Sequence, residues 1–140
     1  MKQAAVGVDS VMLSGAAAAT TARTANLDCA DANYATIRVQ ISAETSTTST
    51  NVALALSEAD DTNATSFVTF NSSFNRTVDN TAAVVATNHI DLDGRKRYLR
   101  LTITPDTTTG GAVITSAVAT LRKTVRSGTA SDYGNDVVVG

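Results

Sequence analysis

Cysteine, histidine and tryptophan are almost absent from this chain of 140 residues, which has one cysteine, one histidine and no tryptophan. The lone Cys29 leaves no internal disulfide, and we expect it to be a small buried hydrophobic residue rather than a reactive thiol, because no basic residue lies close in sequence. The lone His89 has no GxSxG-type nucleophile motif around it and no second histidine with which to share a zinc ion. The sequence therefore predicts a protein that is not an enzyme and has no zinc site.

Long apolar runs and an excess of one charge are also missing. No segment approaches the length of a membrane span. The first 20 residues include a lysine and several alanines, as signal peptides do, but Asp9 and Ser10 interrupt the apolar run, so this stretch is expected to be mature, soluble sequence. A net charge of −2 and a pI near 5.2 provide no general attraction to nucleic acid or to an anionic membrane. Neither is expected as a partner.

Two acidic segments remain as candidates for metal or acid–base chemistry. Asp91, Asp93 and Gly94 are similar to the start of a calcium loop, but the basic residues 95–97 follow where further oxygen ligands belong, so a turn is expected. In the second segment, residues 58–61, a solvated loop is the expected state, and calcium at a subunit boundary is the alternative; its acidic residues are Glu58, Asp60 and Asp61. Glycosidases also present sugar-stacking aromatics, which are scarce here, so no catalytic carboxylate pair is expected. The sequence also predicts no cofactor.

Alanine and threonine supply much of what the chain does contain. Threonine makes up about a sixth of the residues, and its branched Cβ favours strands over helices. Small apolar side chains bury little area each, so a lone monomer of this composition is expected to be only modestly stable and to gain from oligomerisation or docking. The length predicts a single domain.

Alternating side chains predict several strands. Residues 95–104 place Leu99, Leu101 and Ile103 on one face, and residues 33–42 and 51–56 show the same two-residue period. The simplest pairing joins residues 95–104 with 112–123, and residues 33–42 with 51–56 as a hairpin. We expect an all-β, antiparallel, jelly-roll-like β-sandwich of about seven to eight strands. Residues 1–25 are expected to form an N-terminal arm with a short strand, residues 26–126 the sandwich, and residues 127–140 a C-terminal arm.

Basic and apolar segments at the surface are the candidate interfaces. Residues 95–100 are rich in basic side chains and are expected mostly to be solvated strand edges, with docking on an acidic surface as the alternative. The apolar residues of the two ends are expected to pair with a neighbouring subunit or partner. The candidate interface residues are Val11, Met12, Leu13, Arg95, Arg97, Tyr133, Val137, Val138 and Val139.

Two stretches carry a resemblance to a known class of protein. LALSEADDTNATSFVTF at residues 54–70 and YLRLTIT at residues 98–104, within a region from Tyr34 to Lys123, resemble segments of small β-sandwich structural proteins of tailed bacteriophages. Among these the chain is most similar to the capsid cement, or decoration, proteins. The resemblance carries over no individual functional residue.

The resemblance implies a non-enzymatic protein that binds and stabilises a capsid lattice. Its partners are then the major capsid protein and further copies of itself, with a trimer as the first guess. Its location is the capsid surface of the virion, after synthesis in the host cytoplasm. The alternatives are a head–tail connector or tail protein and a carbohydrate-binding module, although the scarcity of tryptophan and tyrosine argues against the last.

Overall fold

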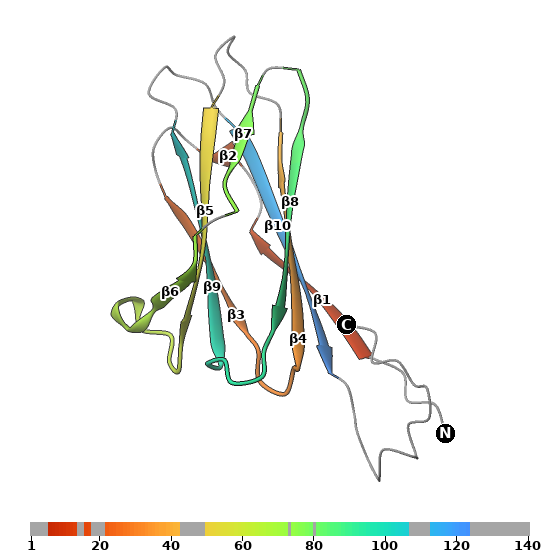
Figure 1. Cartoon of the computed structure of the whole chain (residues 1–140), viewed down its shortest axis with the longest axis vertical. Coiled ribbons are helices and arrows are strands. Elements are labelled where there is room, and N and C mark those ends of the chain that lie inside the picture. Colours follow the sequence, from red (N-terminus) through yellow and green to blue (C-terminus); the bar gives the residue numbers. More distant parts are fainter. Residues whose placement is uncertain are drawn as a thin grey trace.

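The computed structural model describes residues 6–13, 16–17, 22–42, 50–72, 74–79, 81–106 and 113–123. Figure 1 shows that strands dominate this part of the chain. The ten strands are β1 (Val6–Leu13), β2 (Ala16–Ala17), β3 (Arg23–Asp28), β4 (Tyr34–Ile41), β5 (Thr50–Ala59), β6 (Val68–Asn71), β7 (Arg76–Val78), β8 (Val84–Asp91), β9 (Tyr98–Asp106) and β10 (Val113–Lys123). The described residues include a single 3-10 turn, η1 (Ala64–Ser66), and no helix among them could cross a membrane.

The strands form two antiparallel sheets (Figure 1). The first sheet has the order β1-β10-β4-β8, with β2 also paired to β10. The second has the order β3-β9-β5-β6, with β7 also paired to β5. The large aliphatic residues of both sheets lie in one buried cluster between them. The predicted all-β class and the antiparallel β-sandwich are therefore confirmed.

The strand pairs are nested in the sequence, as in a jelly roll. β5 pairs with β6 and β7, β4 pairs with β8, β3 pairs with β9, and the outermost strands β1 and β10 pair with each other. Successive pairs belong to alternate sheets, so the chain winds as one long folded hairpin around a single core. This winding matches the jelly-roll-like topology that the sequence predicts.

β6 and β7 together form one interrupted edge strand along β5. β6 pairs with the end of β5 and β7 with its start, and between them the Oδ1 atom of Asn75 accepts a hydrogen bond of 3.0 Å from the Leu54 amide. A side chain thus replaces a backbone carbonyl at the gap in the ladder. When β6 and β7 are counted as one strand and the two-residue β2 is set aside, eight strands remain, which agrees with the expected number.

Both pairings that the sequence suggested between neighbouring segments are wrong. β9 lies between β3 and β5 in one sheet, whereas β10 lies between β1 and β4 in the other. β4 and β5 likewise lie in opposite sheets instead of forming a hairpin. Each of these strands carries its own row of core-facing aliphatic residues, and a sandwich buries two such rows by placing the strands in facing layers.

β1 corresponds to the short strand expected near the N-terminus and is eight residues long. It runs along β10 from Val6, opposite Lys123, to Leu13, opposite Ala117, with a register shift between Val11 and Leu13. This strand is an edge of the first sheet. The division into two arms and a central domain stays a prediction.

The core follows from the two-residue alternation. In β9, Leu99, Leu101 and Ile103 are buried as predicted, whereas Arg100 and Thr102 between them are partly exposed. Cys29 is buried as well, which confirms its expected structural role. The largest fully buried side chains are those of Ile37, Val39, Ile41, Thr50, Val52, Leu54, Leu56, Val78, Leu99, Leu101 and Ile103.

Two threonines are polar exceptions in this core. Thr50 is 1% and Thr115 is 0% exposed, and neither hydroxyl oxygen has a hydrogen-bond partner among the described residues. A buried hydroxyl without a partner opposes folding, because it loses its hydrogen bonds to water and gains none.

We predict that Thr115→Val raises the free energy of unfolding by about 1 kcal/mol, because a methyl group of similar shape replaces the unpartnered hydroxyl. Chemical denaturation measures the change. Thr36→Val is the control, since the Thr36 hydroxyl lies 3.0 Å from Nδ1 of His89 and has a partner to lose. A Thr115→Val protein less stable than the parent contradicts the prediction.

Candidate functional site

One end of the sandwich is closed by turns whose backbone hydrogen bonds extend the strand ladders of both sheets. This closed end consists of residues 29–33 between β3 and β4, residues 60–67 between β5 and β6, and residues 92–97 between β8 and β9. The Cys29 amide donates to the carbonyl of Arg97, just before β9, at 2.8 Å. The Asn33 amide donates to the carbonyl of Arg122 in β10 at 2.9 Å. Because β9 and β10 belong to different sheets, the turn after β3 connects the two layers.

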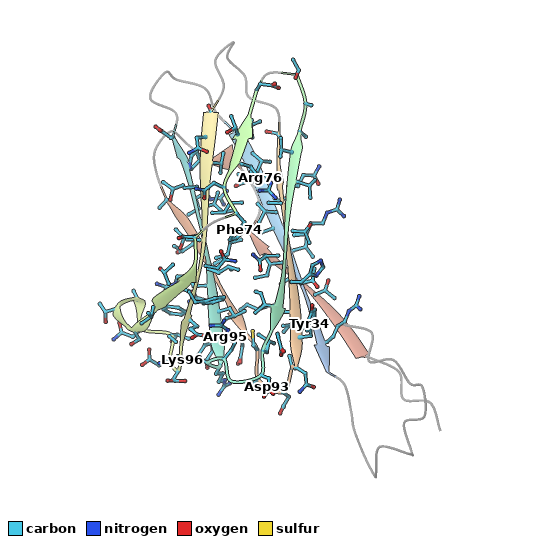
Figure 2. The ribbon with its side chains drawn as sticks, viewed as in Figure 1. Tyr34, Phe74, Arg76, Asp93, Arg95 and Lys96 are labelled. Atoms are coloured by element: carbon cyan, nitrogen blue, oxygen red, sulfur yellow. The ribbon has the colours of Figure 1, made fainter. Side chains whose placement is uncertain are left out.

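The turn expected at residues 91–94 is present at this end. The Asp93 amide donates to Oδ1 of Asp91 at 3.0 Å, and the Arg95 amide donates to the Leu92 carbonyl at 3.0 Å. Gly94 has a φ of 74°, a conformation that a residue without Cβ adopts at little cost. The turn therefore presents three consecutive basic residues at the surface, of which Figure 2 labels Arg95 and Lys96.

Each of these basic residues meets a carboxylate from another part of the chain. The Glu58 side chain is only 18% exposed and also accepts a hydrogen bond of 3.4 Å from the Lys96 amide. The acidic residues at the end of β5 and just after it thus neutralise Arg95 and Lys96, and β3 supplies the partner of Arg97. The ion pairs are Arg95 with Glu58 at 3.5 Å, Lys96 with Asp60 at 2.9 Å and Arg97 with Asp28 at 2.7 Å.

Arginine side chains also cover the aromatic rings of the closed end. The Arg100 guanidinium lies 3.7 Å from the centre of the Phe67 ring, and it donates to Oδ1 of Asn26 at 2.8 Å and to the Ala64 carbonyl at 3.2 Å. Such stacking stabilises a cation over the π-face while leaving its donors free to form hydrogen bonds. Arg95 covers Phe70 at 4.2 Å and Arg97 covers Tyr98 at 4.9 Å in the same way.

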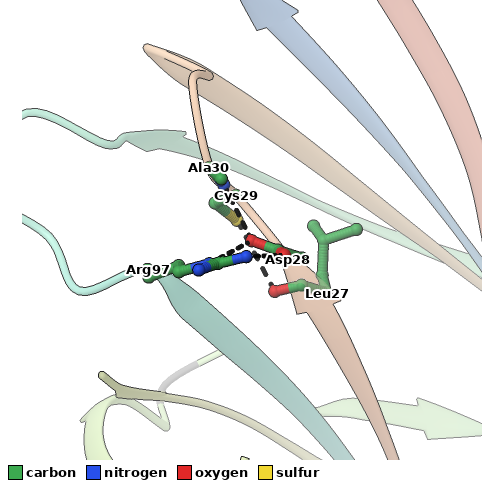
Figure 3. Close-up of polar contacts among 5 residues, drawn as sticks. All are labelled: Leu27, Asp28, Cys29, Ala30 and Arg97. Carbon is green, nitrogen blue, oxygen red and sulfur yellow. Dashed lines mark hydrogen bonds and ion pairs between the residues drawn. The ribbon is translucent and has the colours of Figure 1, made fainter. Parts of the chain in front are cut away.

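Asp28 and Arg97 form the shortest of these ion pairs (Figure 3). Nε and Nη2 of Arg97 donate to the two carboxylate oxygens of Asp28 at 3.0 and 2.7 Å, a two-pronged geometry, and the Ala30 amide adds a third bond at 3.0 Å. These hydrogen bonds, first that of Arg97 and then that of Ala30, lower the pKa of Asp28 from 3.8 to about 2. The same carboxylate raises the pKa of Arg97.

Cys29 lies beside this pair without taking part in it. Its Sγ atom points to the carbonyl of Leu27 at 3.8 Å (Figure 3). Desolvation by burial raises the pKa of the thiol to about 11. At neutral pH the group is therefore protonated and unreactive, in agreement with its expected structural role.

The predicted interface residues lie in three places. Arg95 and Arg97 belong to the closed end, where their side chains are 37% and 54% exposed. Val11, Met12 and Leu13 belong to the edge strand β1. The remaining four lie outside the described residues: Tyr133, Val137, Val138 and Val139.

The acidic candidates do not assemble into a metal site. Within the described parts of the chain, no group of three or more histidine, cysteine or carboxylate side chains is arranged to hold an ion. Glu58 and Asp60 are engaged with Arg95 and Lys96. Asp61 accepts hydrogen bonds from the Asn63 amide and the Ser66 hydroxyl, so it orders the loop that leads into η1.

His89 lies within β8. Its Nδ1 atom is 3.0 Å from the Thr36 hydroxyl, and its ring stacks on Tyr34 at a centroid distance of 6.5 Å. Figure 2 labels Tyr34 near the closed end of the sandwich. The register pairs Thr36 with His89 directly, so all three side chains lie on the outer face of the first sheet.

Sequence reasoning missed the aromatic half of the closed end. The basic residues 95–100 stand out in the sequence, but Phe67 is about thirty positions away from its partner Arg100. The only available signal was the pair of phenylalanines after an acidic segment. Because β5 and β9 pair antiparallel, with Ala59 opposite Tyr98, the loop after β5 and the loop before β9 must meet.

Comparisons with known proteins give structural neighbours but no sequence relative. No family model matches the chain, and no curated protein matches it. The xylan-binding CBM22-1 domain of Paenibacillus barcinonensis Xyn10C aligns with a TM-score of 0.50 and 8% identity, over 83% of this chain and 97% of that domain. The likeness is one of fold. It agrees with the jelly-roll topology.

Two further structures align less closely. The CBM22-1 and GH10 modules of Clostridium thermocellum xylanase 10B give a TM-score of 0.49 at 16% identity. The alignment covers 76% of this chain but only 20% of that longer chain. The pili of Bacillus endospore appendages give a TM-score of 0.41 at 14% identity, over 89% of this chain and 88% of that one.

The Asp28–Arg97 pair makes stability depend on pH. Because the folded-state pKa of Asp28 lies near 2, below its ordinary 3.8, the pair stabilises the fold above about pH 4 and its contribution disappears as the pH falls toward 2. We predict that Asp28→Asn lowers the melting temperature at pH 7 and that the gap to the parent closes by pH 2. Thermal melts across this range test it. Asp93→Asn, at a carboxylate with no ion pair to any described residue, is expected to show no such gap.

Proposed function

We propose that this chain is a non-enzymatic structural protein of a phage virion, which binds the major capsid protein and stabilises the capsid lattice as a cement protein. The resemblance over residues 34–123 motivates the choice of class. The fold is compatible with it, since jelly-roll sandwiches are common among capsid proteins, although they also occur in lectins.

The pairing of β1 with β10 is the observation that supports this proposal most. It places Val6 opposite Lys123, so the chain enters and leaves the sandwich side by side. Lys123 is also one residue beyond Arg122, whose carbonyl is bonded to the closed end. Val6 and Lys123 therefore lie next to each other at the same end of the sandwich as the turn of residues 29–33. A lattice contact that combines terminal segments with the closed end needs this arrangement.

The closed end is suited to binding a protein surface rather than a small molecule. Its charged side chains are held by ion pairs and by stacking on rings, which limits the conformational entropy that they lose on docking. Arg97 remains 54% exposed although its Nε and Nη2 atoms both donate to Asp28. A rigid polar surface of this kind favours specificity and orientation, and the apolar contacts must come from elsewhere.

Two other functions remain as rivals. A head–tail connector or tail protein shares the fold and differs in copy number. A carbohydrate-binding module is favoured by one observation, the stacked Tyr34 and His89 rings on the outer face of the first sheet, with the Thr36 hydroxyl beside them. Ring stacking combined with hydrogen-bonding side chains is the usual chemistry of sugar recognition.

Copy number in purified particles tests the proposal. We expect a ratio of order one between this chain and the major capsid protein by quantitative mass spectrometry. A few copies per particle favour a neck or tail component, and absence from particles refutes a virion role.

Deleting residues 127–140 is expected to abolish lattice binding while leaving the melting temperature of the sandwich unchanged. Full occupancy by the truncated protein contradicts the role of the terminal segment.

A double substitution tests the closed end. Arg95→Ala with Arg97→Ala is expected to reduce occupancy on capsids at least tenfold, because it removes two oriented donors from the proposed contact. Arg38→Ala is the matched control, since Arg38 is an exposed arginine in the middle of β4, away from this end. Asp28→Asn controls for the lost ion pair, because it keeps the Arg97 guanidinium. Equal occupancy of the double variant and the Arg38→Ala protein refutes the contact.

Retention in xylan-containing gels tests the carbohydrate alternative, since xylan is the ligand named for the Paenibacillus domain. The proposal predicts no retardation of the parent protein. Retardation that disappears in Tyr34→Ala favours the binding-module function instead.

A further inference from the structure

The edge strand β8 lacks the features that protect the other sheet edges. It pairs with β4 in an unbroken register over all eight residues, and among the described residues no second strand forms a ladder with it. β7 of the other sheet approaches β8 without pairing. Free edges are normally shielded by charges, proline, bulges or short length. β8 contains no lysine, arginine or proline, and its only carboxylate is the final residue, Asp91.

Each of the other edges carries at least one such feature. β1 has a register shift between Val11 and Leu13. β6 is four residues long and β5 has a register shift opposite it, while β7 is three residues long and begins with Arg76. β3 begins with Arg23 and ends with Asp28. β8 is thus a long, regular and nearly uncharged edge that also exposes an apolar side chain, Val85, at 40%.

We infer that β8 is a self-association edge, which pairs antiparallel with β8 of a second copy of this chain to join two first sheets into one. The inference is independent of what the protein binds in a particle. Association through a two-fold axis uses the same strand from both copies, so the strand must be complementary to itself.

The sequence of β8 satisfies this requirement over its longest uncharged run in one register. Directly opposite residues of an antiparallel pair share a face of the sheet. A two-fold axis must therefore pass midway between one residue and the same residue of the second copy, which is called below the residue on the axis. The uncharged run from Val84 to Ile90 is symmetric about Thr87. With Thr87 on the axis, Val85 lies opposite His89 of the second copy on the outer face, and Val84 lies opposite its Ile90 on the core side.

The neighbouring register is less favourable. An axis through Asn88 places the exposed Val85 opposite the Asp91 carboxylate of the second copy and brings a charged residue into the ladder. With Thr87 on the axis, both copies of Asp91 lie just beyond the paired run. The seven paired residues form a smaller contact than a standard interface of about 1,600 Å². The dimer should therefore dissociate on dilution.

Charge substitution on the axis tests the inference. The parent protein is expected to show twice the monomer mass in light scattering at high concentration and to approach monomer mass on dilution. Thr87→Lys and Thr87→Glu should each be monomeric at the same high concentration, because like charges then lie directly opposite each other. An equimolar mixture of the two should regain the dimer mass. Thr69→Lys, at an exposed position of β6, is the control and should dimerise like the parent.

Disulfide trapping gives a second, independent measurement. Thr87→Cys is expected to crosslink to itself on mild oxidation, since opposite residues on a two-fold axis lie within disulfide range, and the buried Cys29 does not compete. Thr24→Cys, at an exposed position of the edge strand β3, is the control and should stay monomeric. A parent that is monomeric at all concentrations, together with equal crosslinking of the two cysteine variants, overturns the inference. So does a dimer that Thr87→Lys leaves intact.

Discussion

The structure depends on the nested antiparallel pairing of strands that are far apart in sequence. β1 and β10 stand at opposite ends of the described chain, yet they pair over most of their length, and β3 with β9 and β4 with β8 repeat the arrangement inside them. Each sheet therefore contains strands from both the N-terminal and the C-terminal half of the described chain, and it forms only when both halves have come together. Such a topology closes long loops before most contacts form, which is typical of slowly folding β proteins. The closed end and the edges follow from this winding.

The sequence predicted strands far better than it predicted their partners. The alternation of Leu99, Leu101 and Ile103 identifies β9 and its buried face, because the two-residue period is a local property. Which strand lies beside it is not local. β9 pairs with β3 and β5, whose matching residues lie about 40 to 80 positions earlier, and sequence spacing alone favours the nearest strand. The wrong pairing of β9 with β10 has this origin.

The candidate site was predictable to the same extent. Arg95 and Arg97 stand out as charges at a turn, and Asp91 to Gly94 follow turn chemistry that depends on neighbouring residues only. The partners of these arginines come from β3, from the end of β5 and from β6, all brought to this end by the winding. A solvated loop was therefore the natural expectation for Glu58 and Asp60, whereas the structure uses them to neutralise the basic turn.

The distribution of charge separates the tasks of the two surfaces. At the closed end, three basic side chains are already neutralised within the chain, so a partner gains little net Coulomb energy there and meets a fixed pattern of donors and rings. β8 has almost no charge, has one edge along which no described strand pairs, and exposes Val85. An edge strand can gain affinity for a partner from backbone pairing and apolar burial, and all of the groups that it uses belong to one continuous segment. The closed end is thereby better suited to orienting a contact, and the edge to forming one.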